Sequence, residues 1–375
     1  MNDDDIEATR PAKLAKGLPP SSSLGPVLDL LKISKTLTPS PEKKIKDEEE
    51  DEGEKKMEDD RKREDEKNKA TKKKQEDDLR VKKLKSYTQF VDKPPFPDFK
   101  NPRPEECQLA HRILCALHGE RQRPPALRLP RTGVECGNVP SVLDALIRTV
   151  LSQNTNSRNS TRAKHDMDEA YTAFDEKDGS VDVQARWHRI ATGGAERLGK
   201  AIAKGGLGAV KSKVIVDILR QVKERYGTYS LDHLLRVGET ASSLREEQDI
   251  VMRELLSYRG VGTKTASCVL LFCVGRDSFA VDTHVYRLAG ILGWRPARAT
   301  RDETFAHLDS RIPDQLKYSL HILLIEHGRE CPECRAGAVK EGNCKLRKAF
   351  VTSARLAAEY DAREGMSRVN ADLST

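Results

Sequence analysis

Aromatic residues are scarce in this chain of 375 residues: they make up 5% of it, with only two tryptophans. A long apolar run is missing as well, since the longest, around Cys268 to Val274, is far shorter than the roughly 20 residues that cross a bilayer. No apolar stretch typical of a secretory signal follows Met1, and the acidic start argues against a simple transit peptide. We therefore expect an intracellular, soluble protein without membrane association.

Alternation of apolar and polar residues, the pattern of a half-buried β-strand, is not sustained anywhere in the sequence. Helical spacing is common instead. A first amphipathic helix is predicted around Leu109 to Leu117, and Pro140 opens a second that ends at Gln153. Further helices are predicted over about residues 158–174, 181–191, 195–204, 211–226 and 231–237. The expected fold class is all-α.

Charged residues, 33% of the chain, divide it into two unlike parts. Residues 1–95 are poor in apolar side chains and carry a run of mixed charges from Lys43 to Lys85, so they cannot bury enough surface to fold alone. We expect a disordered charged arm there, a folded domain over residues 96–365 and a flexible tail over residues 366–375. Short lysine clusters in the arm are typical of nuclear import, so the nucleus is the expected location, with a mitochondrial pool as the alternative.

The segment Gly260-Val261-Gly262 is predicted to join two helices. Apolar residues upstream recur at helical intervals up to about Arg259, and a second helix is predicted to start near Thr263. The glycines allow a tight reversal whose backbone N–H groups are not shielded by side chains, and such groups at a helix start attract phosphate. Residues 260–263 are therefore predicted to hold a nucleic-acid backbone without reading its sequence, because phosphate contacts position a protein and base contacts specify.

Two other motifs that combine glycine and lysine are excluded. A Walker phosphate loop requires glycine directly before its lysine and another glycine five residues before that one, but this chain has Thr263 and Tyr258 at those places. A dinucleotide-binding fingerprint follows a β-strand, whereas the residues before Gly260 have helical spacing.

Lys264 lies just inside the second predicted helix, and Asp282 follows it eighteen residues later. The segment between them, residues 265–272, is apolar enough to be a buried helix that holds the amine and the carboxylate at the two ends of one rigid unit. An amine and an acid in a common pocket suggest excision of a base from DNA. Taken singly, each residue has a simpler role: Lys264 as a phosphate contact, Asp282 as the N-cap of the next helix, and His284 as a structural hydrogen-bonding residue.

Residues 259–266, Arg-Gly-Val-Gly-Thr-Lys-Thr-Ala, and residues 280–287, Ala-Val-Asp-Thr-His-Val-Tyr-Arg, resemble the signature of the helix-hairpin-helix DNA glycosylases of endonuclease III type. The interval from Lys264 to Asp282 is similar to that family's as well. Residues 151–156 and 206–208 resemble further parts of it, and the likeness spans roughly residues 104–350. The chain departs from the family at Tyr258-Arg259, where Leu-Pro is usual, and this departure affects the expected loop shape.

The resemblance implies a helix-hairpin-helix fold of two helical lobes with a cleft between them. One lobe, a helical barrel with the hairpin, is expected over about residues 140–274. The other combines residues 96–139 with residues 275–365. The cleft would hold Lys264 and Asp282, and the implied partner is double-stranded DNA that contains a damaged or modified base. We expect the protein to be monomeric.

The resemblance also implies a chemistry for these two residues. Lys264 would attack the sugar carbon that carries the base, and the covalent imine would lead on to strand cleavage by β-elimination. The amine must be uncharged, and its place in the first turn of a helix disfavours the ammonium form. Asp282 would transfer a proton and stabilise positive charge on the opening sugar. The substrates implied by analogy are oxidised pyrimidines.

Base excision requires the target base to leave the stack, so a side chain must fill the vacated space. Gln153 resembles the family's gap-filling glutamine, and Leu207 lies where a wedge residue is expected. Phosphate contacts are predicted for basic residues on the flanking loops: Arg158, Arg162, Lys204, Lys211 and Lys213.

Two alternatives stay open beside a combined glycosylase and lyase. In a monofunctional glycosylase, water would be the nucleophile, and Lys264 argues against this. A non-catalytic DNA-binding module would keep the hairpin without the chemistry, and Asp282 argues against that.

The eight cysteines divide into groups with different expected roles. Cys268 and Cys273 fall in the apolar helix and are predicted to be buried reduced thiols. Cys331, Cys334 and Cys344 follow the position at which many relatives carry an iron–sulfur loop, but their spacings of two and nine residues differ from the family's, and a cubane cluster is normally held by four thiolates. A cysteine from elsewhere or His327, in a zinc-like Cys3His site, would complete a metal site. The simplest interpretation is a lost cluster, so no cofactor is expected to be required.

Overall fold

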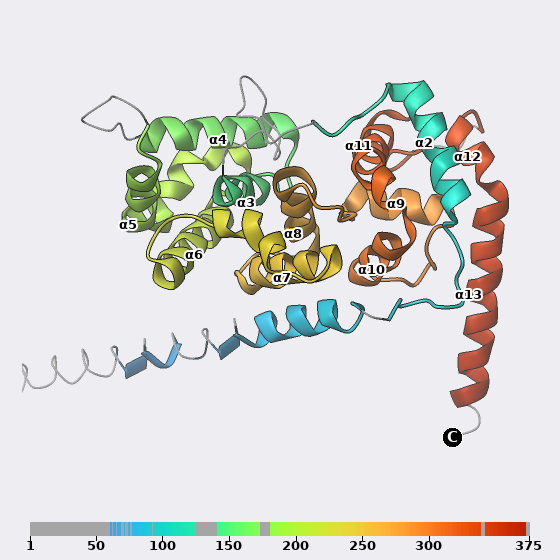
Figure 1. Ribbon diagram of the computed structural model, residues 1–375, viewed down its shortest axis with the longest axis horizontal. Helices are drawn as coiled ribbons and strands as arrows, with labels where there is room; N and C mark the ends of the chain where they lie inside the picture. The colour runs from blue at the N-terminus through green and yellow to red at the C-terminus, as the bar shows by residue number, and fades with distance from the viewer. Residues whose placement is uncertain are drawn as a thin grey trace, which may run out of the picture. The chain divides into compact units, whose positions relative to one another are not determined.

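The computed structural model of the chain describes residues 77–91, 93–124, 141–172, 181–338 and 342–372, together with scattered residues between 61 and 75. The chain divides into two units, Met1–Lys67 and Asn68–Thr375, and all of the structure discussed below belongs to the second. Its described elements are helices, with no β-strand among them (Figure 1). The expected all-α fold class is confirmed. No helix in the part of the chain that the structure describes is both long and apolar enough to cross a membrane.

One group of helices surrounds α3 (Val142–Leu151), which lies at the centre of the first lobe. All of its residues except Arg148 are buried, because the sequence Val-Leu-Asp-Ala-Leu-Ile-Arg-Thr-Val-Leu is apolar on almost every side. Ser141 begins the helix by accepting a hydrogen bond from the backbone N–H of Asp144. The elements around α3 are α4 (Ser157–Tyr171), α5 (Val183–Ala201), η2 (Ala203–Gly205), α6 (Gly208–Tyr226), η3 (Asp232–Glu239), α7 (Leu244–Ser257), α8 (Thr263–Val269) and η4 (Leu270–Val274).

The second group joins an early helix to the C-terminal ones. The early helix, α2 (Pro104–His118), packs against two later helices, α11 and α12, so segments far apart in the sequence lie side by side (Figure 1). This group contains α9 (Thr283–Ile291), α10 (Arg301–Arg311), α11 (Asp314–Glu330), α12 (Lys345–Ala349) and α13 (Val351–Asp372). The expected arrangement of two helical lobes is thus present.

The helices predicted over residues 181–191 and 195–204 meet within α5 at Gly194, where φ is 76° and the backbone is not helical, so the predicted break is present. One boundary differs from expectation. α13 continues to Asp372, into the segment 366–375 that we expected to be a flexible tail.

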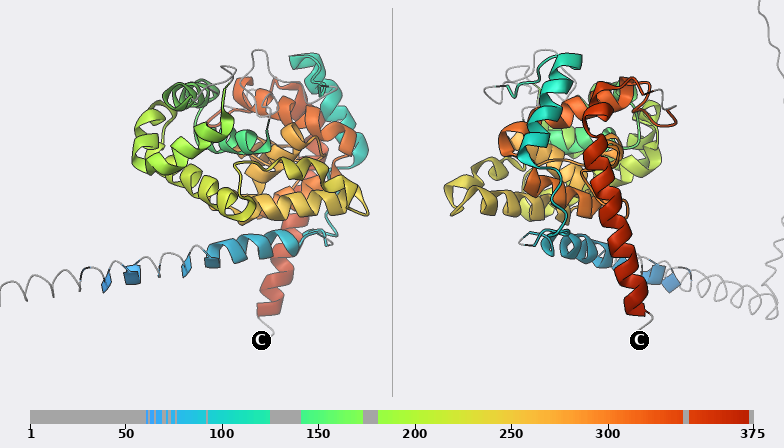
Figure 2. Two further views of the ribbon diagram at one scale, coloured as in Figure 1. Left: turned by 60° about the vertical axis from the view of Figure 1, so that its left-hand side comes forward. Right: turned by 90° about the vertical axis from the view of Figure 1, so that its right-hand side faces the viewer.

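Residues 77–88 form a helix inside the segment predicted to be a disordered arm. Lys83 Nζ donates hydrogen bonds to the carbonyl oxygens of Leu256, Tyr258 and Val261, at 2.9–3.0 Å, which uses all three of its protons. Leu84 and Tyr87 pack against the main core, and Figure 2 shows the helix running alongside α7. The expected end of the arm at residue 95 is therefore wrong for this helix, because charge composition does not reveal tertiary acceptors. The arm before residue 61 lies outside the described residues and stays a prediction.

Candidate active site

The glycine hairpin between α7 and α8 closes as its sequence predicts. α7 ends at Ser257, and Gly260 has a φ of 73°, in the left-handed region that favours glycine. A Cβ at Gly260 would lie 2.7 Å from both methyl carbons of Val214 on α6, so the close approach of the hairpin to α6 also requires glycine. Val261 is fully buried, which anchors the loop. Gly262 is the N-cap of α8 and supplies no side-chain cap, so the first N–H groups of this helix are left for another acceptor.

Tyr258 and Arg259, which stand where the family usually has Leu-Pro, are held by polar contacts with α7 and α6. Tyr258 is fully buried, and its hydroxyl donates to Glu254 Oε1 at 2.6 Å. Burial is the main cause that raises the pKa of Tyr258, so the phenol stays protonated. Arg259 donates to Asp217 Oδ2 at 3.0 Å. These contacts fix the loop by a route other than proline.

Lys264 and Asp282 line one pocket, of about 560 Å³, between the two groups of helices. Lys264 lies in the first turn of α8 and Asp282 directly precedes α9. Both are half-buried. The pocket is also lined by residues of α11, Ile325 and Arg329, and by the loop after α3, so it lies where the lobes meet.

Two buried side chains, Cys268 and His321, interact electrostatically with both of these groups. Burial first, and the Asp282 carboxylate second in that direction, raise the pKa of Cys268, while a hydrogen bond and the charge of Lys264 lower it. Burial lowers the pKa of His321 to about 4, with Asp282 raising it and Lys264 lowering it. His321 Nδ1 donates to Ala280 O at 2.8 Å, because a carbonyl oxygen only accepts. The amine and the carboxylate therefore share one neighbourhood, with a neutral imidazole and a thiol beneath them.

Asp282 is the N-cap of α9, which is the simpler role that the sequence suggested for this residue. Its Oδ1 accepts hydrogen bonds from the N–H groups of His284 and Val285, each at 2.8 Å. These bonds fix the carboxylate at the pocket wall. His284 lies beside Arg287, which donates to its Nδ1 at 3.2 Å and to Gly328 O at 2.8 Å.

Gln153 connects the loop after α3 to the hairpin. Its Nε2 donates to Gly260 O at 3.2 Å and to Thr265 Oγ1 at 3.1 Å, and its side chain lines the pocket. Filling the space of an extruded base would require Gln153 to exchange these two bonds for contacts with DNA.

Leu207 lies on a neighbouring loop and projects into solvent. It has a left-handed backbone conformation with φ of 54°, and 52% of its surface is exposed. A Cβ at Gly206 would be 4.0 Å from Thr155 Oγ1, so this loop lies next to the one that carries Gln153. An exposed leucine beside the pocket fits what the wedge role requires.

Lys211 corrects one of our predictions. It is 3% exposed, and its Nζ donates to Leu151 O at 2.8 Å and to Gly205 O at 3.0 Å, so it ties the end of α3 to the turn before α6. Burial lowers its pKa. The predicted phosphate contact is wrong for Lys211, because its ammonium group satisfies carbonyl groups inside the protein.

The other predicted phosphate partners lie at the surface. Lys213, Arg158 and Arg162 are exposed. Lys204 is exposed as well, with Nζ 3.2 Å from Asp166 Oδ2.

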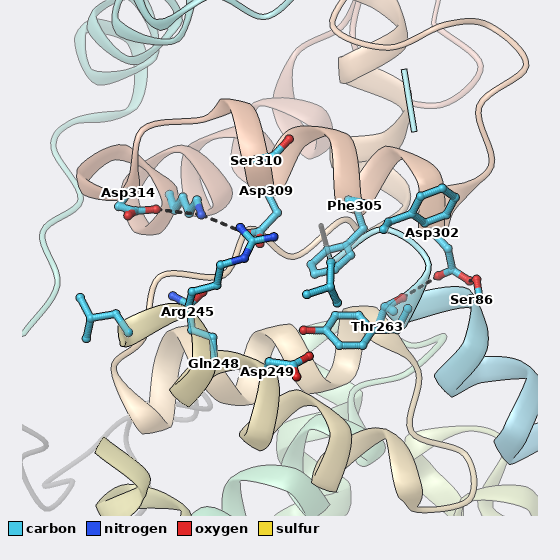
Figure 3. Close-up of a pocket in the computed structure, with 16 residues that line it drawn as sticks. Ser86, Arg245, Gln248, Asp249, Thr263, Asp302, Phe305, Asp309, Ser310 and Asp314 are labelled. Atoms are coloured by element: carbon cyan, nitrogen blue, oxygen red, sulfur yellow. Dashed lines mark hydrogen bonds and ion pairs between the residues drawn. The ribbon is translucent and has the colours of Figure 1, made fainter. Parts of the chain in front are cut away.

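A second pocket, between helix 77–88, α7 and α10, is acidic (Figure 3). Its wall carries the carboxylates of Asp249, Asp302, Asp309 and Asp314. Asp302 accepts hydrogen bonds from Thr263 at 2.6 Å and from Ser86 at 3.4 Å, so it links α8 to helix 77–88. Arg245 and Lys317 line the same pocket, and Lys317 pairs with Asp309 and Asp314 at 3.2 and 2.8 Å. The carboxylates still outnumber the cations, and we assign the pocket no part in binding nucleic acid.

His327 joins the three C-terminal cysteines. The ligand atoms of His327, Cys331, Cys334 and Cys344 all lie within 4.8 Å of one another. The Sγ atoms of Cys334 and Cys344 are 3.7 Å apart, and Cys344 Sγ is 3.4 Å from His327 Nε2. Cys268 and Cys273 are buried and form no disulfide bond within the part of the chain that the structure describes, as expected, and Cys136 lies outside it.

Sequence reasoning missed several residues of the pocket. Arg301 and Arg329 bring positive charge to its wall, and Thr155 lines it as well. The buried His321 interacts electrostatically with Lys264 and Asp282. The spacing of His321 gives no signal, because α11 buries it against residues from α8 and α9 that are distant in sequence. Cys268 had a usable signal: it follows Lys264 by four residues, which places both on one helix face.

The sequence comparisons agree with this geometry. Residues 147–314 match the profile of the HhH-GPD superfamily of base excision DNA repair proteins. An Arabidopsis thaliana protein provisionally named a DNA glycosylase is 32% identical over 264 residues, covering 66% of this chain and 83% of the relative. Endonuclease III of Thermotoga maritima is 32% identical over 197 residues, covering 50% of this chain and 78% of the relative.

Among solved structures, a trapped covalent complex of endonuclease III with DNA is similar, with a TM-score of 0.48 and 20% identity over 67% of this chain and 97% of that one.

An all-helical fold, a glycine hairpin and a pocket that combines a lysine with an aspartate define the class of helix-hairpin-helix repair proteins. This chain belongs to the HhH-GPD superfamily of base excision DNA repair proteins, as an endonuclease III-like member. The family expected from the sequence is confirmed.

Proposed function

We propose that this protein is a DNA glycosylase with an associated lyase activity, which removes a damaged or modified base from double-stranded DNA and then cuts the strand. The observation that carries this proposal is the common pocket of Lys264 and Asp282. A glycosylase without lyase activity needs no amine there. The Thermotoga maritima relative is named an endonuclease, an enzyme that cuts strands, which supports the same conclusion.

DNA would bind across the pocket with its backbone on the hairpin. The N–H groups around Gly262 would hold a phosphate, with exposed basic side chains such as Lys213 and Arg158 beside it. Leu207, exposed and next to the pocket, would enter the duplex where the target nucleotide leaves the stack. Gln153 would leave its bonds to Gly260 and Thr265 and occupy part of the vacated space.

The reaction would proceed through a covalent imine. Nζ of Lys264 forms a bond to C1′ of the sugar, the bond from C1′ to the base breaks, and the base leaves with its electron pair and gains a proton. The sugar ring opens to give the protonated imine. Loss of a proton from C2′ then expels the 3′ phosphate, and water releases Lys264. Asp282, fixed by its cap bonds, would stabilise the positive charge and carry the protons.

The surroundings of Lys264 support an uncharged amine. Its position in the first turn of α8 puts it at the positive end of the helix dipole. Arg301 and Arg329 on the same pocket wall add positive charge, which also disfavours an ammonium group. The carboxylates of Asp282 and Asp302 line the same pocket and act in the opposite direction, so the helix dipole and the two arginines must outweigh them.

Borohydride trapping on duplexes with a single lesion tests the role of Lys264. The wild-type protein should give a covalent complex with DNA, since borohydride reduces the imine, and Lys264→Ala should give none. Lys200→Ala serves as the matched control, because it removes an exposed lysine of α5 that does not line the pocket, and it should keep trapping. Trapping that survives Lys264→Ala would refute the assignment.

The same assay distinguishes the two alternatives. Base release without a strand cut, unless heat or alkali is added, would indicate a monofunctional glycosylase with water as the nucleophile. Failure to release any base from a panel of lesions would indicate a DNA-binding module without catalysis.

Oxidised pyrimidines are the substrates that we propose, by analogy with endonuclease III. Initial rates on duplexes that contain one oxidised pyrimidine, one oxidised guanine or one methylated cytosine would rank these classes. We propose a monomeric protein that acts in the nucleus, which imaging of the tagged full chain and its elution volume would test.

A further inference from the structure

Four potential metal ligands meet where α11 ends and α12 begins. His327 lies in the last turn of α11, Cys331 is its C-cap, Cys334 lies in the turn that follows and Cys344 is the N-cap of α12. His327, Cys334 and Cys344 are buried. We propose that these four side chains bind one zinc ion in a structural Cys3His site, at the position where relatives of this family carry an iron–sulfur cluster.

The distances between the ligand atoms fit a single tetrahedral ion. Two sulfurs bound to one zinc at about 2.3 Å lie about 3.8 Å apart in a tetrahedron, and a sulfur and a nitrogen lie about 3.6 Å apart. Here the Sγ atoms of Cys334 and Cys344 are separated by 3.7 Å, and Cys344 Sγ lies 3.4 Å from His327 Nε2. All four ligand atoms lie within 4.8 Å of one another, so small movements of the side chains would bring Cys331 onto the same ion.

A cubane cluster does not fit the same residues. Such a cluster is held by four thiolates, each on its own iron, and the cluster itself keeps their sulfurs apart. Sulfurs in van der Waals contact leave no room for two irons between them. A set of three thiolates and one imidazole is instead typical of zinc, whereas magnesium and calcium prefer oxygen ligands.

A hydrogen bond to His118 orients His327 as zinc ligation requires. With Nε2 of His327 on the metal, its Nδ1 carries the hydrogen and donates to His118 Nε2, 2.9 Å away on α2. The other ring nitrogen of His118 lies 3.4 Å from the Glu330 carboxylate. Metal-binding histidines generally donate their second N–H in this way, which fixes the ring and strengthens the ligand.

The loop that supplies Cys344 is also held in place without the metal. The Glu333 carboxylate accepts hydrogen bonds from the N–H groups of Gly342, Asn343 and Cys344. Arg347 donates to Glu333 O at 2.9 Å. These contacts direct Cys344 towards Cys334, so the site is preorganised.

The proposed zinc site connects to the active site through one arginine. Arg287 of α9 donates from Nε to Cys334 O at 2.9 Å and from Nη2 to Gly328 O at 2.8 Å. The N-cap of the same helix is Asp282. Zinc would therefore stabilise the packing of α9, α11 and α12 and take no part in the reaction.

Elemental analysis tests the proposal on the full chain, purified without a polyhistidine tag. We expect one zinc per chain and, after exchange with cobalt, the visible absorption of tetrahedral Co²⁺ with thiolate ligands. Iron together with the absorption of an iron–sulfur cluster would overturn the proposal. So would a protein without bound metal, whether its thiols are free or joined in a disulfide.

Ligand variants identify the residues. His327→Ala and Cys334→Ser should lose zinc, and Cys115→Ser is a matched control that should keep it. Cys331 is only half-buried, so Cys331→Ser should fold, and it should lower the thiolate absorption of the cobalt form by about one third. Retention of one zinc per chain in His327→Ala would overturn His327 as a ligand.

Substitution of His118, the hydrogen-bond partner of His327, gives an independent test. His118→Ala should weaken zinc affinity about 10- to 100-fold in competition with a chromophoric chelator. His111→Ala, on the same helix but outside the contact with His327, should leave the affinity unchanged. Equal affinities for the two variants would contradict the proposed orientation of His327.

Discussion

Lysine residues close together in this sequence have opposite roles, which burial decides. Lys211 is enclosed and satisfies two carbonyl groups, whereas Lys213, two positions further along α6, is exposed. On a helix, positions i and i+2 face different sides, so one of the pair points to the core when the other points to solvent. An identical residue type thus holds the protein together at one position and is available to a phosphate at the other.

Substitution of each of these two lysines by alanine should separate the effect on stability from the effect on DNA binding. Lys211→Ala should lower the free energy of unfolding by about 1–3 kcal/mol, because two buried carbonyl groups lose their donor. Lys213→Ala should leave stability unchanged, weaken binding to all duplexes alike and reduce the salt dependence of the affinity by roughly one phosphate contact. Urea unfolding and binding titrations at several salt concentrations measure both effects. A selective loss on one lesion for Lys213→Ala would contradict its phosphate role.

Among the helical elements, the hairpin depends on a segment outside the signature that identifies it. Helix 77–88 supplies Lys83, whose ammonium group collects three carbonyl groups from the end of α7 and from the hairpin. Carbonyl groups at a helix end lack partners in their own helix, and a lysine side chain is a suitable donor for them. Burial first, and the charge of Arg80 second, lower the pKa of Lys83 to about 8. The hairpin therefore gains its shape partly from distant residues.

Replacement of Lys83 by methionine should release the hairpin. Lys83→Met keeps the length of the side chain but removes the donor, so we expect a loss of about 1–3 kcal/mol in unfolding free energy and weaker binding to undamaged and damaged duplexes alike. Lys82→Met, an exposed neighbour, is the control and should change neither. Thermal unfolding and binding titrations measure the effects. An unchanged melting temperature for Lys83→Met would show that the contact contributes nothing.

The whole molecule buries several histidines in the neutral form, and this sets its response to acid. His307 is fully buried between Phe96 and Phe99, and its Nε2 donates to Asn101 O at 2.7 Å. Burial, with a smaller contribution from the charge of Arg311, lowers its pKa to about 4, although the hydrogen bond to Asn101 acts in the opposite direction. The unfolded chain binds the proton near pH 6.5 and the folded chain only near pH 4. The stabilisation is complete above pH 6.5 and is lost as the pH falls towards 4.

Acid should therefore destabilise the protein well before its carboxylates titrate. We expect His307 alone to reduce the free energy of unfolding by roughly 2 kcal/mol between pH 7.5 and pH 5. The variant His307→Gln cannot take up the proton and should show a pH dependence that is smaller by that amount. Urea unfolding at the two pH values measures this change in the free energy of unfolding. An equal change for the wild-type protein and His307→Gln would refute the role of His307.

The sequence alone determined the features that local spacing encodes. Helical periodicity predicted α3, α4, α6 and the break in α5, and the glycines predicted the hairpin. Lys264 and Asp282 could be paired because a buried helix of fixed length separates them. Each of these properties depends on residues within a few turns of one another, which a sequence displays directly.

Only the tertiary structure decided which polar groups are buried and by what they are satisfied. Lys211, Lys83 and His321 find their partners in segments far away in the chain, and His327 meets Cys344 only because α11 and α12 converge. Composition had assigned helix 77–88 to a disordered arm, since charge predicts solvation unless acceptors are provided elsewhere. The physical reason is that burial of a charged or metal-binding group depends on the convergence of distant elements, which no local pattern of residues contains.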